Sequence, residues 1–293
     1  MKSGKNFLKS KVVVKKIVEI ADIKKNDVVL EVGPGKGALT EELLKYAKKV
    51  IAVEKDERLA EFLKKKFCGC KNLELMQGDI LKVQSPKSKV QNYNSKFKTL
   101  RNLKKYKIVA NIPYYITSRF IRNFLTAENQ PVKAVLMVQK EVAERICAKP
   151  PKMNMLAISV QSYGEPEIAF KVARKYFSPQ PKVDSAVIII DNISRKFFKK
   201  FKESFNSGLN VNINQRSLIY TIKDQNTEKE FFDLVKTGFS HKRKLLINNL
   251  AKIKTKKELE MAFKKCEIAP NARAQELNLK DWKYLTIKQS RIG

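Results

Sequence analysis

Short apolar runs alternate with amphipathic segments along much of the chain. The amphipathic segments repeat their apolar positions with the period of a helix, at residues 11–23, 39–44, 59–67, 228–250 and 256–263. The runs rich in β-branched residues predict strands, at residues 27–32, 50–54, 73–76, 107–110, 134–138, 157–163 and 186–190. Strands separated by helices are typical of an α/β fold with a mostly parallel sheet. The last two runs lie around turn-forming glycine and proline residues and favour an antiparallel edge.

Two polar, lysine-rich segments without a clear period interrupt this pattern. Residues 85–105 predict an exposed loop, and residues 191–226 predict a linker or insertion. The pattern after the second segment is helical only, and Asp281 begins a last short helix. A chain of 293 residues suggests two domains at about 150 residues each. We therefore predict a first domain at 1–190 and a small helical domain at 191–293.

The chain is strongly basic. It has 61 lysine and arginine residues against 29 acidic ones, a formal net charge of +32 at pH 7. Hydrophobic residues make up 43% of the chain, too many for a disordered basic tail, so the charge belongs to the surface of a folded protein. Nucleic acid is the polyanion that such a surface favours. Lysine far outnumbers arginine, which favours attraction to phosphates over the reading of base edges.

The same composition excludes several classes of protein. No apolar run approaches the roughly 18 residues of a membrane span, and no apolar signal segment follows the charged start. We therefore expect a cytoplasmic protein with no membrane partner. The four cysteines lack paired spacing and His241 is the only histidine, so we expect free thiols and no metal site. With one histidine and no nucleophile motif, hydrolysis by a Ser-His-Asp triad is not expected.

A glycine-rich loop follows the first predicted strand and precedes a helix. Residues 31–37 read Glu-Val-Gly-Pro-Gly-Lys-Gly, with Gly33, Gly35 and Gly37 spaced two apart. Glycine allows a ligand to approach the backbone closely, and the following helix offers unpaired N–H groups. Position 38 is alanine, so the loop lacks the third glycine of the dinucleotide motif. No Gly-Lys-Ser/Thr sequence follows either, so nothing here is suited to a pyrophosphate.

Carboxylates follow at the ends of the next two predicted strands. Glu54 can bind the two hydroxyls of a ribose, and Asp79 can accept a hydrogen bond from the exocyclic amine of an adenine. Together with the glycine loop, these residues predict a site for a nucleoside without a phosphate tail. S-adenosylmethionine fits this description best, and we predict it as a methyl donor.

The residues Asn111-Ile112-Pro113-Tyr114 follow the fourth predicted strand. An exocyclic amine of a base is a poor nucleophile because its lone pair is delocalised into the ring. The Asn111 amide oxygen and a backbone carbonyl beside Pro113 can accept both N6 hydrogens of an adenine and favour a pyramidal, more reactive nitrogen. Tyr114 can stack on the base, which must leave its helix or loop to react. Positioning and electrostatics then suffice for methyl transfer from a sulfonium.

Several motifs occur together in a family-specific order. They are Gly4-Lys5-Asn6-Phe7-Leu8, Glu31 to Gly37, Gly78-Asp79, Asn111 to Tyr114, Phe177 to Ala186, Phe239 to Leu245 and Pro270 to Leu277. In this order they resemble the ribosomal RNA adenine N6,N6-dimethyltransferases of the KsgA type. The resemblance implies a Rossmann-like class I methyltransferase sheet of seven strands, followed by a small all-helical C-terminal domain.

The resemblance also implies roles for individual residues. The residues implied for the donor site are Asn6, Leu8, Gly33, Gly35, Glu54, Asp79, Ile80 and Asn111. Asn111, Pro113 and Tyr114 would form the target-base site. Phe177 would close over the base, with packing in the core as a competing interpretation. The implied product is N6,N6-dimethyladenosine at two adjacent adenosines in a hairpin loop near the 3′ end of 16S rRNA. The implied partner is the 30S ribosomal particle during its biogenesis, and we expect a monomer.

Two other functions stay open at this point. The large-subunit (23S) rRNA adenine N6-methyltransferases of the macrolide-resistance type share Asn-x-Pro-Tyr and the glycine loop. The motifs at 239–250 and 270–277 favour the small-subunit enzymes instead. The second alternative is an RNA-binding assembly factor that has lost methylation. Such a factor would not need Asn111, Tyr114 and Glu54, and all three are intact in this chain.

Overall fold

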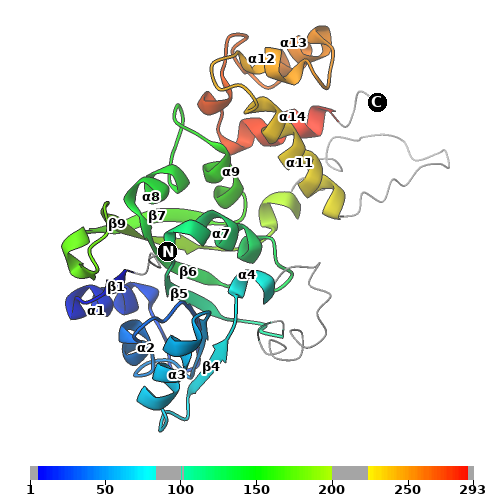
Figure 1. Cartoon of the computed structure of the whole chain (residues 1–293). Coiled ribbons are helices and arrows are strands. Elements are labelled where there is room, and N and C mark those ends of the chain that lie inside the picture. Colours follow the sequence, from blue (N-terminus) through cyan, green and yellow to red (C-terminus); the bar gives the residue numbers. More distant parts are fainter. Residues whose placement is uncertain (1–5, 84–99, 101, 200–223, 290–293) are drawn as a thin grey trace, which may run out of the picture. The chain divides into compact units, whose positions relative to one another are not determined.

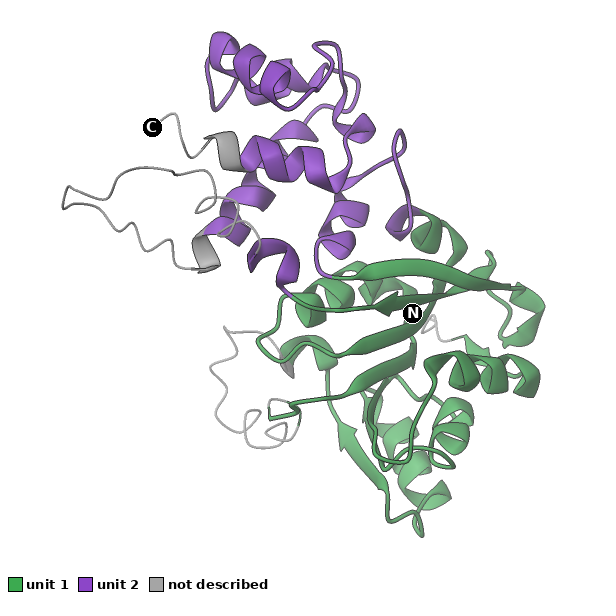
Figure 2. Cartoon of the chain, turned by 180° about the vertical axis from the view of Figure 1, so that it is seen from behind, with its two compact units in different colours: residues 1–144, 164–194 green, residues 145–163, 195–293 purple. Residues whose placement is uncertain are grey.

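The chain forms two compact units in the computed structural model. The structure describes residues 6–83, 100, 102–199 and 224–289 (Figure 1). Unit 1 comprises residues 1–144 and 164–194, and unit 2 comprises residues 145–163 and 195–293 (Figure 2). The sequence did not indicate that residues 145–163 would join the second unit, and the boundary between residues 190 and 191 stays a prediction. The predicted loop at 85–105 and linker at 191–226 lie largely outside the described residues.

A seven-stranded sheet forms the centre of the described part of unit 1. Its strands are β2 (Val28–Val32), β3 (Lys49–Glu54), β4 (Leu73–Gln77), β5 (Lys107–Asn111), β6 (Lys133–Gln139), β7 (Glu165–Val172) and β9 (Ser185–Asp191). The order in space is β4-β3-β2-β5-β6-β9-β7, with parallel pairing from β4 to β6. Strand β9 pairs antiparallel with both β6 and β7. The predicted α/β fold with an antiparallel edge is confirmed.

Helices connect the parallel strands of unit 1, as the βαβ pattern of the sequence predicts. The connecting helices are α2 (Ala38–Leu43), α3 (Glu57–Lys66), α4 (Ile80–Val83) and α7 (Thr117–Leu125). Helix α1 (Lys11–Ala21) precedes β2, and the first part of α8 (Lys140–Ile146) follows β6. Ser10 caps α1 by accepting a hydrogen bond from the Val13 N–H. None of the helices in the described ranges is long and apolar enough to cross a membrane.

One hydrophobic cluster joins α1 to a face of the sheet. From α1 it contains Val14, Ile17 and Val18, and from the sheet it contains alternate residues such as Val135 and Met137 of β6. Successive residues of a strand point to opposite faces. The residues between these, such as Leu136, therefore pack on the other side of the sheet, and both faces are buried. This explains why the strands appear in the sequence as continuous apolar runs.

Unit 2 is helical throughout its described secondary structure. Its elements are the last residues of α8, α9 (Met155–Gln161), α11 (Asp224–Gly238), α12 (Leu246–Leu250), α13 (Lys256–Lys265), the 3₁₀ turn η3 (Ala274–Glu276) and α14 (Leu279–Gln289). Trp282 and Phe231 are fully buried in it. The predicted helical C-terminal region is therefore confirmed.

Two of the predicted elements differ from the structure. The strand predicted at 157–163 is wrong, because this segment forms α9, and the strand β7 follows it instead. Asn154 caps α9 by accepting hydrogen bonds from the N–H groups of Leu156 and Ala157. A short apolar run fits a buried strand and a buried helix equally well by periodicity alone. The single helix predicted at 228–250 is also wrong, because it is divided into α11 and α12.

The division between α11 and α12 has a structural cause. The side-chain amide of Asn249 donates hydrogen bonds to the backbone carbonyls of Gly238 (2.6 Å) and His241 (3.0 Å). The first bond satisfies a carbonyl at the end of α11 that no further helical turn can pair, and the second holds the connection that follows the helix. A Cβ atom at Gly238 would lie only 2.4 Å from Cη2 of Trp282. Glycine at this position therefore allows α11 to end against the ring of Trp282.

Candidate functional site

Four of the predicted site residues follow neighbouring parallel strands at the same edge of the sheet. Gly33 follows β2, Glu54 ends β3, Asp79 lies shortly after β4, and Asn111 ends β5. The chain adds β3 and β4 on one side of β2 and then crosses to β5 on the other side, so the strand order reverses between β2 and β5. Open α/β sheets bind ligands at the carboxyl ends of the strands beside such a reversal. The fold thus brings these four residues to the edge where a ligand site is expected.

The glycine-rich loop packs against two other segments of this edge. Gly33, Gly35 and Gly37 have φ angles of +67°, +61° and +78°, a left-handed conformation that glycine adopts without strain. A Cβ atom on Gly35 would lie 2.9 Å from Cδ1 of Phe7, and one on Gly33 would lie 3.6 Å from Cδ of Pro113. The loop therefore lies between the N-terminal segment and the turn that follows β5.

The carboxylate of Glu54 is buried and held in one orientation. The residue is 5% exposed. Its Oε2 atom accepts a hydrogen bond from the Gly35 N–H (3.2 Å), and its Oε1 atom accepts one from the Asp56 N–H (2.8 Å). A carboxylate offers about four lone-pair positions, so each oxygen can accept one further hydrogen bond. Glu54 is therefore preorganised to receive a pair of hydroxyl groups.

Asp79 lies in the turn between β4 and α4. Its Oδ1 atom accepts a hydrogen bond from the Leu81 N–H (3.0 Å), and its Oδ2 atom lies 3.0 Å from Nζ of Lys55. The side chain of Lys55 is 65% exposed and that of Asp79 is 20% exposed, so the ion pair borders solvent. Ile80 is buried beside Asp79. The pairing with Lys55 is a feature that the sequence analysis missed.

The turn after β5 holds Tyr114 against the start of β9. Tyr114 begins the 3₁₀ turn η1 (Tyr114–Ile116), and its hydroxyl group lies 2.8 Å from Oγ of Ser185. Ser185 is fully buried as the first residue of β9. Burial raises the pKa of the Tyr114 phenol, so its hydroxyl stays protonated at neutral pH. Ser185 lies within the family motif at 177–186, but only the folded structure shows that it meets Tyr114.

A separate two-stranded sheet joins the N-terminal segment to a later part of unit 1. Strand β1 (Phe7–Leu8) pairs antiparallel with β8 (Phe177–Ser178), and Leu8 lies opposite Phe177. This pairing holds Asn6 and Leu8 beside the glycine loop, which Phe7 contacts. Phe177 is 2% exposed and belongs to the core cluster of unit 1. Its packing role is therefore visible in the structure, and its contact with a target base stays a prediction.

Glu31, the first residue of the glycine-rich motif, is a buried acid. It is 1% exposed, and its Oε2 atom has no hydrogen-bond partner within the described part of the chain. Burial raises the pKa of the Glu31 carboxyl to about 8, and the nearby charge of Glu54 adds to this shift. The sequence analysis gave this residue no role, because its place in a strand end does not reveal burial.

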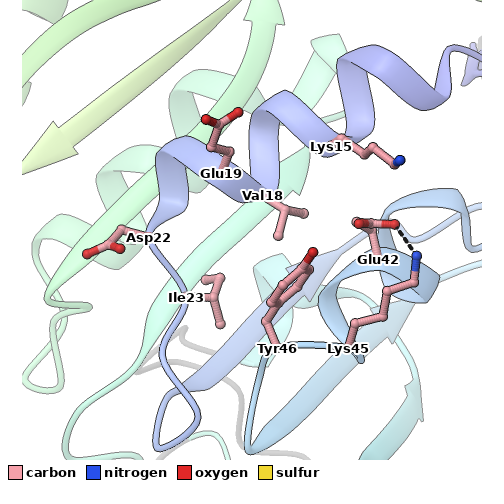
Figure 3. A pocket seen from close by; sticks show the side chains of 8 residues that line it. All are labelled: Lys15, Val18, Glu19, Asp22, Ile23, Glu42, Lys45 and Tyr46. Carbon is pink, nitrogen blue, oxygen red and sulfur yellow. Dashed lines mark hydrogen bonds and ion pairs between the residues drawn. The ribbon is translucent and has the colours of Figure 1, made fainter.

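A depression of about 440 Å³ lies elsewhere in unit 1, between α1 and α2 (Figure 3). Charged side chains line most of it, and Glu42 and Lys45 form an ion pair across 2.6 Å (Figure 3). It shares no residue with the predicted site. Within the described ranges, no group of three or more histidine, cysteine or acidic residues is arranged to hold a metal ion.

Comparisons with known proteins show which family the chain belongs to. Residues 1–217 match the family described as "Ribosomal RNA adenine dimethylase". The chain is 39% identical to the "Ribosomal RNA small subunit methyltransferase A" of Dehalococcoides mccartyi, over 97% of this chain and 86% of that protein. It is 37% identical to the protein of the same name from Fusobacterium nucleatum, over 95% of this chain and 92% of that protein.

Solved structures share the fold over nearly the whole chain. A dimethyladenosine transferase from Plasmodium falciparum has a TM-score of 0.69 and 27% identity, with 95% of each chain covered. The 23S rRNA methyltransferase ErmE also has a TM-score of 0.69, at 23% identity, with 98% of this chain and all of that chain covered. At that identity, the likeness to ErmE concerns the fold alone. On the match over residues 1–217 and the identity to full-length relatives, this chain belongs to the ribosomal RNA adenine dimethylase family.

Proposed function

We propose that this enzyme transfers methyl groups from S-adenosylmethionine to N6 of two adjacent adenosines in a hairpin loop near the 3′ end of 16S rRNA. The proposal rests on the position of four residues at the carboxyl ends of neighbouring parallel strands, namely Gly33, Glu54, Asp79 and Asn111. This edge occurs in a chain that is 39% identical to a protein named for small-subunit methylation. The preferred substrate would be a 30S particle during its biogenesis in the cytoplasm, and the enzyme would act as a monomer.

The donor half of the proposed site lies along β2, β3 and β4. Glu54 would accept hydrogen bonds from the two ribose hydroxyls, because each of its oxygens has one acceptor position left. Asp79 would accept a hydrogen bond from the adenine amine, with buried Ile80 against the ring. Gly33 and Gly35 would let the donor approach the backbone, and Asn6 and Leu8 would contact it from the N-terminal side.

The acceptor half of the proposed site lies in the turn after β5. The Asn111 amide oxygen and a carbonyl beside Pro113 would accept the two N6 hydrogens, which directs the nitrogen lone pair out of the ring plane. Tyr114 would stack on the extruded base, and its bond to Ser185 fixes the position of its hydroxyl end. Phe177, the first residue of β8, would contact the same base. The donor supplies an electrophilic methyl group on a sulfonium, so correct alignment supplies most of the catalysis.

The contact between Gly33 and Pro113 supports the coupling of the two halves. A Cβ at Gly33 would lie 3.6 Å from the Pro113 ring, so the loop for the donor and the turn for the base lie next to each other. Groups that react with each other must be held within about 3–3.5 Å. Two loops that pack on each other at the strand-order reversal suit this requirement.

One experiment tests the proposal against both alternatives. The enzyme is incubated with methyl-labelled donor and either 30S or 50S particles whose rRNA lacks methylated adenosines, and the nucleosides are analysed by mass spectrometry. We expect N6,N6-dimethyladenosine from 30S particles alone. Product from 50S particles alone would favour the macrolide-resistance type. Tight binding of 30S particles without any product would favour the assembly factor that has lost methylation.

A further inference from the structure

Two consecutive tyrosines of the turn after β5 have opposite environments. Tyr114 is held by its hydroxyl bond to Ser185. Tyr115 is 77% exposed, the highest exposure among the large apolar side chains in the described residues. An aromatic ring so exposed contributes little to the core, yet it lies one residue from the proposed base site. The structure therefore offers a free aromatic face beside the position where an adenine would be bound.

Cationic side chains continue this surface along α7. The helix buries Phe120, Ile121 and Phe124, and its exposed side carries Arg119 and Arg122. Residues three and four positions apart lie on the same side of a helix. Arg119 is four positions after Tyr115, in the helix that continues directly from η1, and Arg122 is three positions further. Together these three residues form a stripe, here called the Tyr115 stripe, that leads away from Asn111.

An aromatic ring followed by arginines suits single-stranded RNA. Bases stack on exposed aromatic side chains whatever their sequence, and arginine binds the phosphates between them. Extrusion of a base from a hairpin loop leaves the neighbouring base without its stacking partner. An aromatic side chain next to the pocket can replace that partner and so lower the cost of extrusion.

We propose that Tyr115 stacks on the nucleotide next to the extruded adenosine and that Arg119 and Arg122 bind the phosphates that flank it. The inference rests on the proposed function, because it takes the base bound at Asn111 as its starting point. The occupant of the Tyr115 stripe is thus the single-stranded part of the RNA hairpin loop. Tyr115 holds the RNA in register, while Asn111 and Tyr114 act on the reacting base.

The test compares three variants with the wild-type enzyme on 30S particles. Tyr115→Ala removes the ring, Tyr115→Phe keeps it, and Tyr46→Ala is the matched control. Tyr46 is also exposed, at 48%, but it precedes β3 and so lies at the opposite end of the strands. We measure KM and kcat for 30S particles, the affinity for the donor by calorimetry, and the affinity for 30S particles without donor by filter binding.

Loss of one stacked base is expected to raise KM for 30S particles by about 5- to 100-fold in Tyr115→Ala. Donor affinity should not change, and Tyr115→Phe and Tyr46→Ala should stay within about twofold of wild type in KM and in 30S affinity. Arg119→Ala should lower the slope of log KM against log salt by about one. A Tyr115→Ala variant that matches wild type in KM and 30S affinity would overturn the inference. So would a Tyr115→Phe variant as defective as Tyr115→Ala, since stacking needs only the ring.

If the proposed function is wrong, the measurements give a result that differs from a failure of the stacking inference alone. In that case the wild-type enzyme itself produces no methylated adenosine on 30S particles. The filter-binding comparison still decides the inference, because it needs no methyl transfer. Equal binding of 30S particles by wild type and Tyr115→Ala rejects a stacking role, and weaker binding by Tyr115→Ala alone supports it.

Discussion

The buried carboxyl of Glu31 should make unit 1 less stable as the pH rises. Its pKa is raised by burial from an ordinary value near 4.5 to about 8. Between these values the folded chain keeps the proton while the unfolded chain has released it. The unfolded state then binds fewer protons, so the free energy of unfolding falls with increasing pH. The fall begins near about pH 4.5 and ends above about pH 8.

The size of the change in the free energy of unfolding follows from the pKa shift of Glu31. Each pH unit inside this window changes the free energy of unfolding by about 1.4 kcal/mol. Between about pH 5 and about pH 8, Glu31 should therefore lower it by about 3 to 4 kcal/mol. Glu31→Gln keeps the shape of the side chain and removes the titration. The variant should have nearly wild-type stability at about pH 5 and exceed the wild type by about 3 to 4 kcal/mol at about pH 8.

Urea unfolding at several pH values measures this difference. Far-UV circular dichroism follows both units, while Trp282, the single tryptophan, reports unit 2 by fluorescence and serves as an internal control. Glu41→Gln is the control of opposite sign, because the hydrogen bond to Lys66 lowers the pKa of the exposed Glu41 carboxyl. The stability that this ion pair contributes is complete above about pH 4.5 and is lost only at lower pH, so the difference between Glu41→Gln and wild type should stay constant between about pH 5 and about pH 8. A difference between Glu31→Gln and wild type that is the same at every pH would refute the reasoning.

Four further predictions concern the site, unit 2 and the RNA. Asn111→Ala should abolish dimethyladenosine formation, measured by nucleoside mass spectrometry, and leave 30S binding within about twofold; unchanged turnover would exclude Asn111 from the base site. Gly35→Ala combines a left-handed backbone with a Cβ clash, so strain of about 1–2 kcal/mol should weaken donor binding in calorimetry, and unaltered affinity would contradict this. Gly238→Ala puts a Cβ 2.4 Å from Trp282 and should destabilise unit 2 by about 1–3 kcal/mol in urea, followed by fluorescence; a wild-type midpoint would mean that the ring can move. With a net charge of +32, KM for 30S particles should rise about tenfold or more between about 50 and 200 mM salt, and a flat titration would count against the basic surface.

The parallel half of the sheet was predictable because most residues of its inner strands are buried on both faces. Strands β3, β5 and β6 appear as nearly continuous apolar runs, and polar site residues stand at the ends of β3 and β5. The position of Glu54 and Asn111 at one edge then follows from topology alone, since parallel strands end on the same side. In this part of the chain, local pattern and tertiary packing agree.

The sequence-based predictions were wrong or incomplete where a contact between residues outside the local pattern determines the structure. Residues 157–163 have an apolar run that fits either element, and the Asn154 cap makes it a helix. Strand β7 carries polar residues at exposed positions of the sheet edge, so its pattern is weak. The contacts of Phe7 with the glycine loop and of Tyr114 with Ser185 join distant parts of the chain. No periodicity in the sequence reports such contacts.

The pairing of Leu8 with Phe177 has a consequence for the order in which the enzyme becomes competent. One wall of the proposed donor site comes from the segment around β1, but the strand that pairs with it, β8, is synthesised only when most of unit 1 already exists. A nascent chain that ends before residue 177 has its glycine loop but lacks the partner strand of β1. Binding of the methyl donor should therefore arise only after residue 177 has been synthesised, rather than grow gradually with chain length.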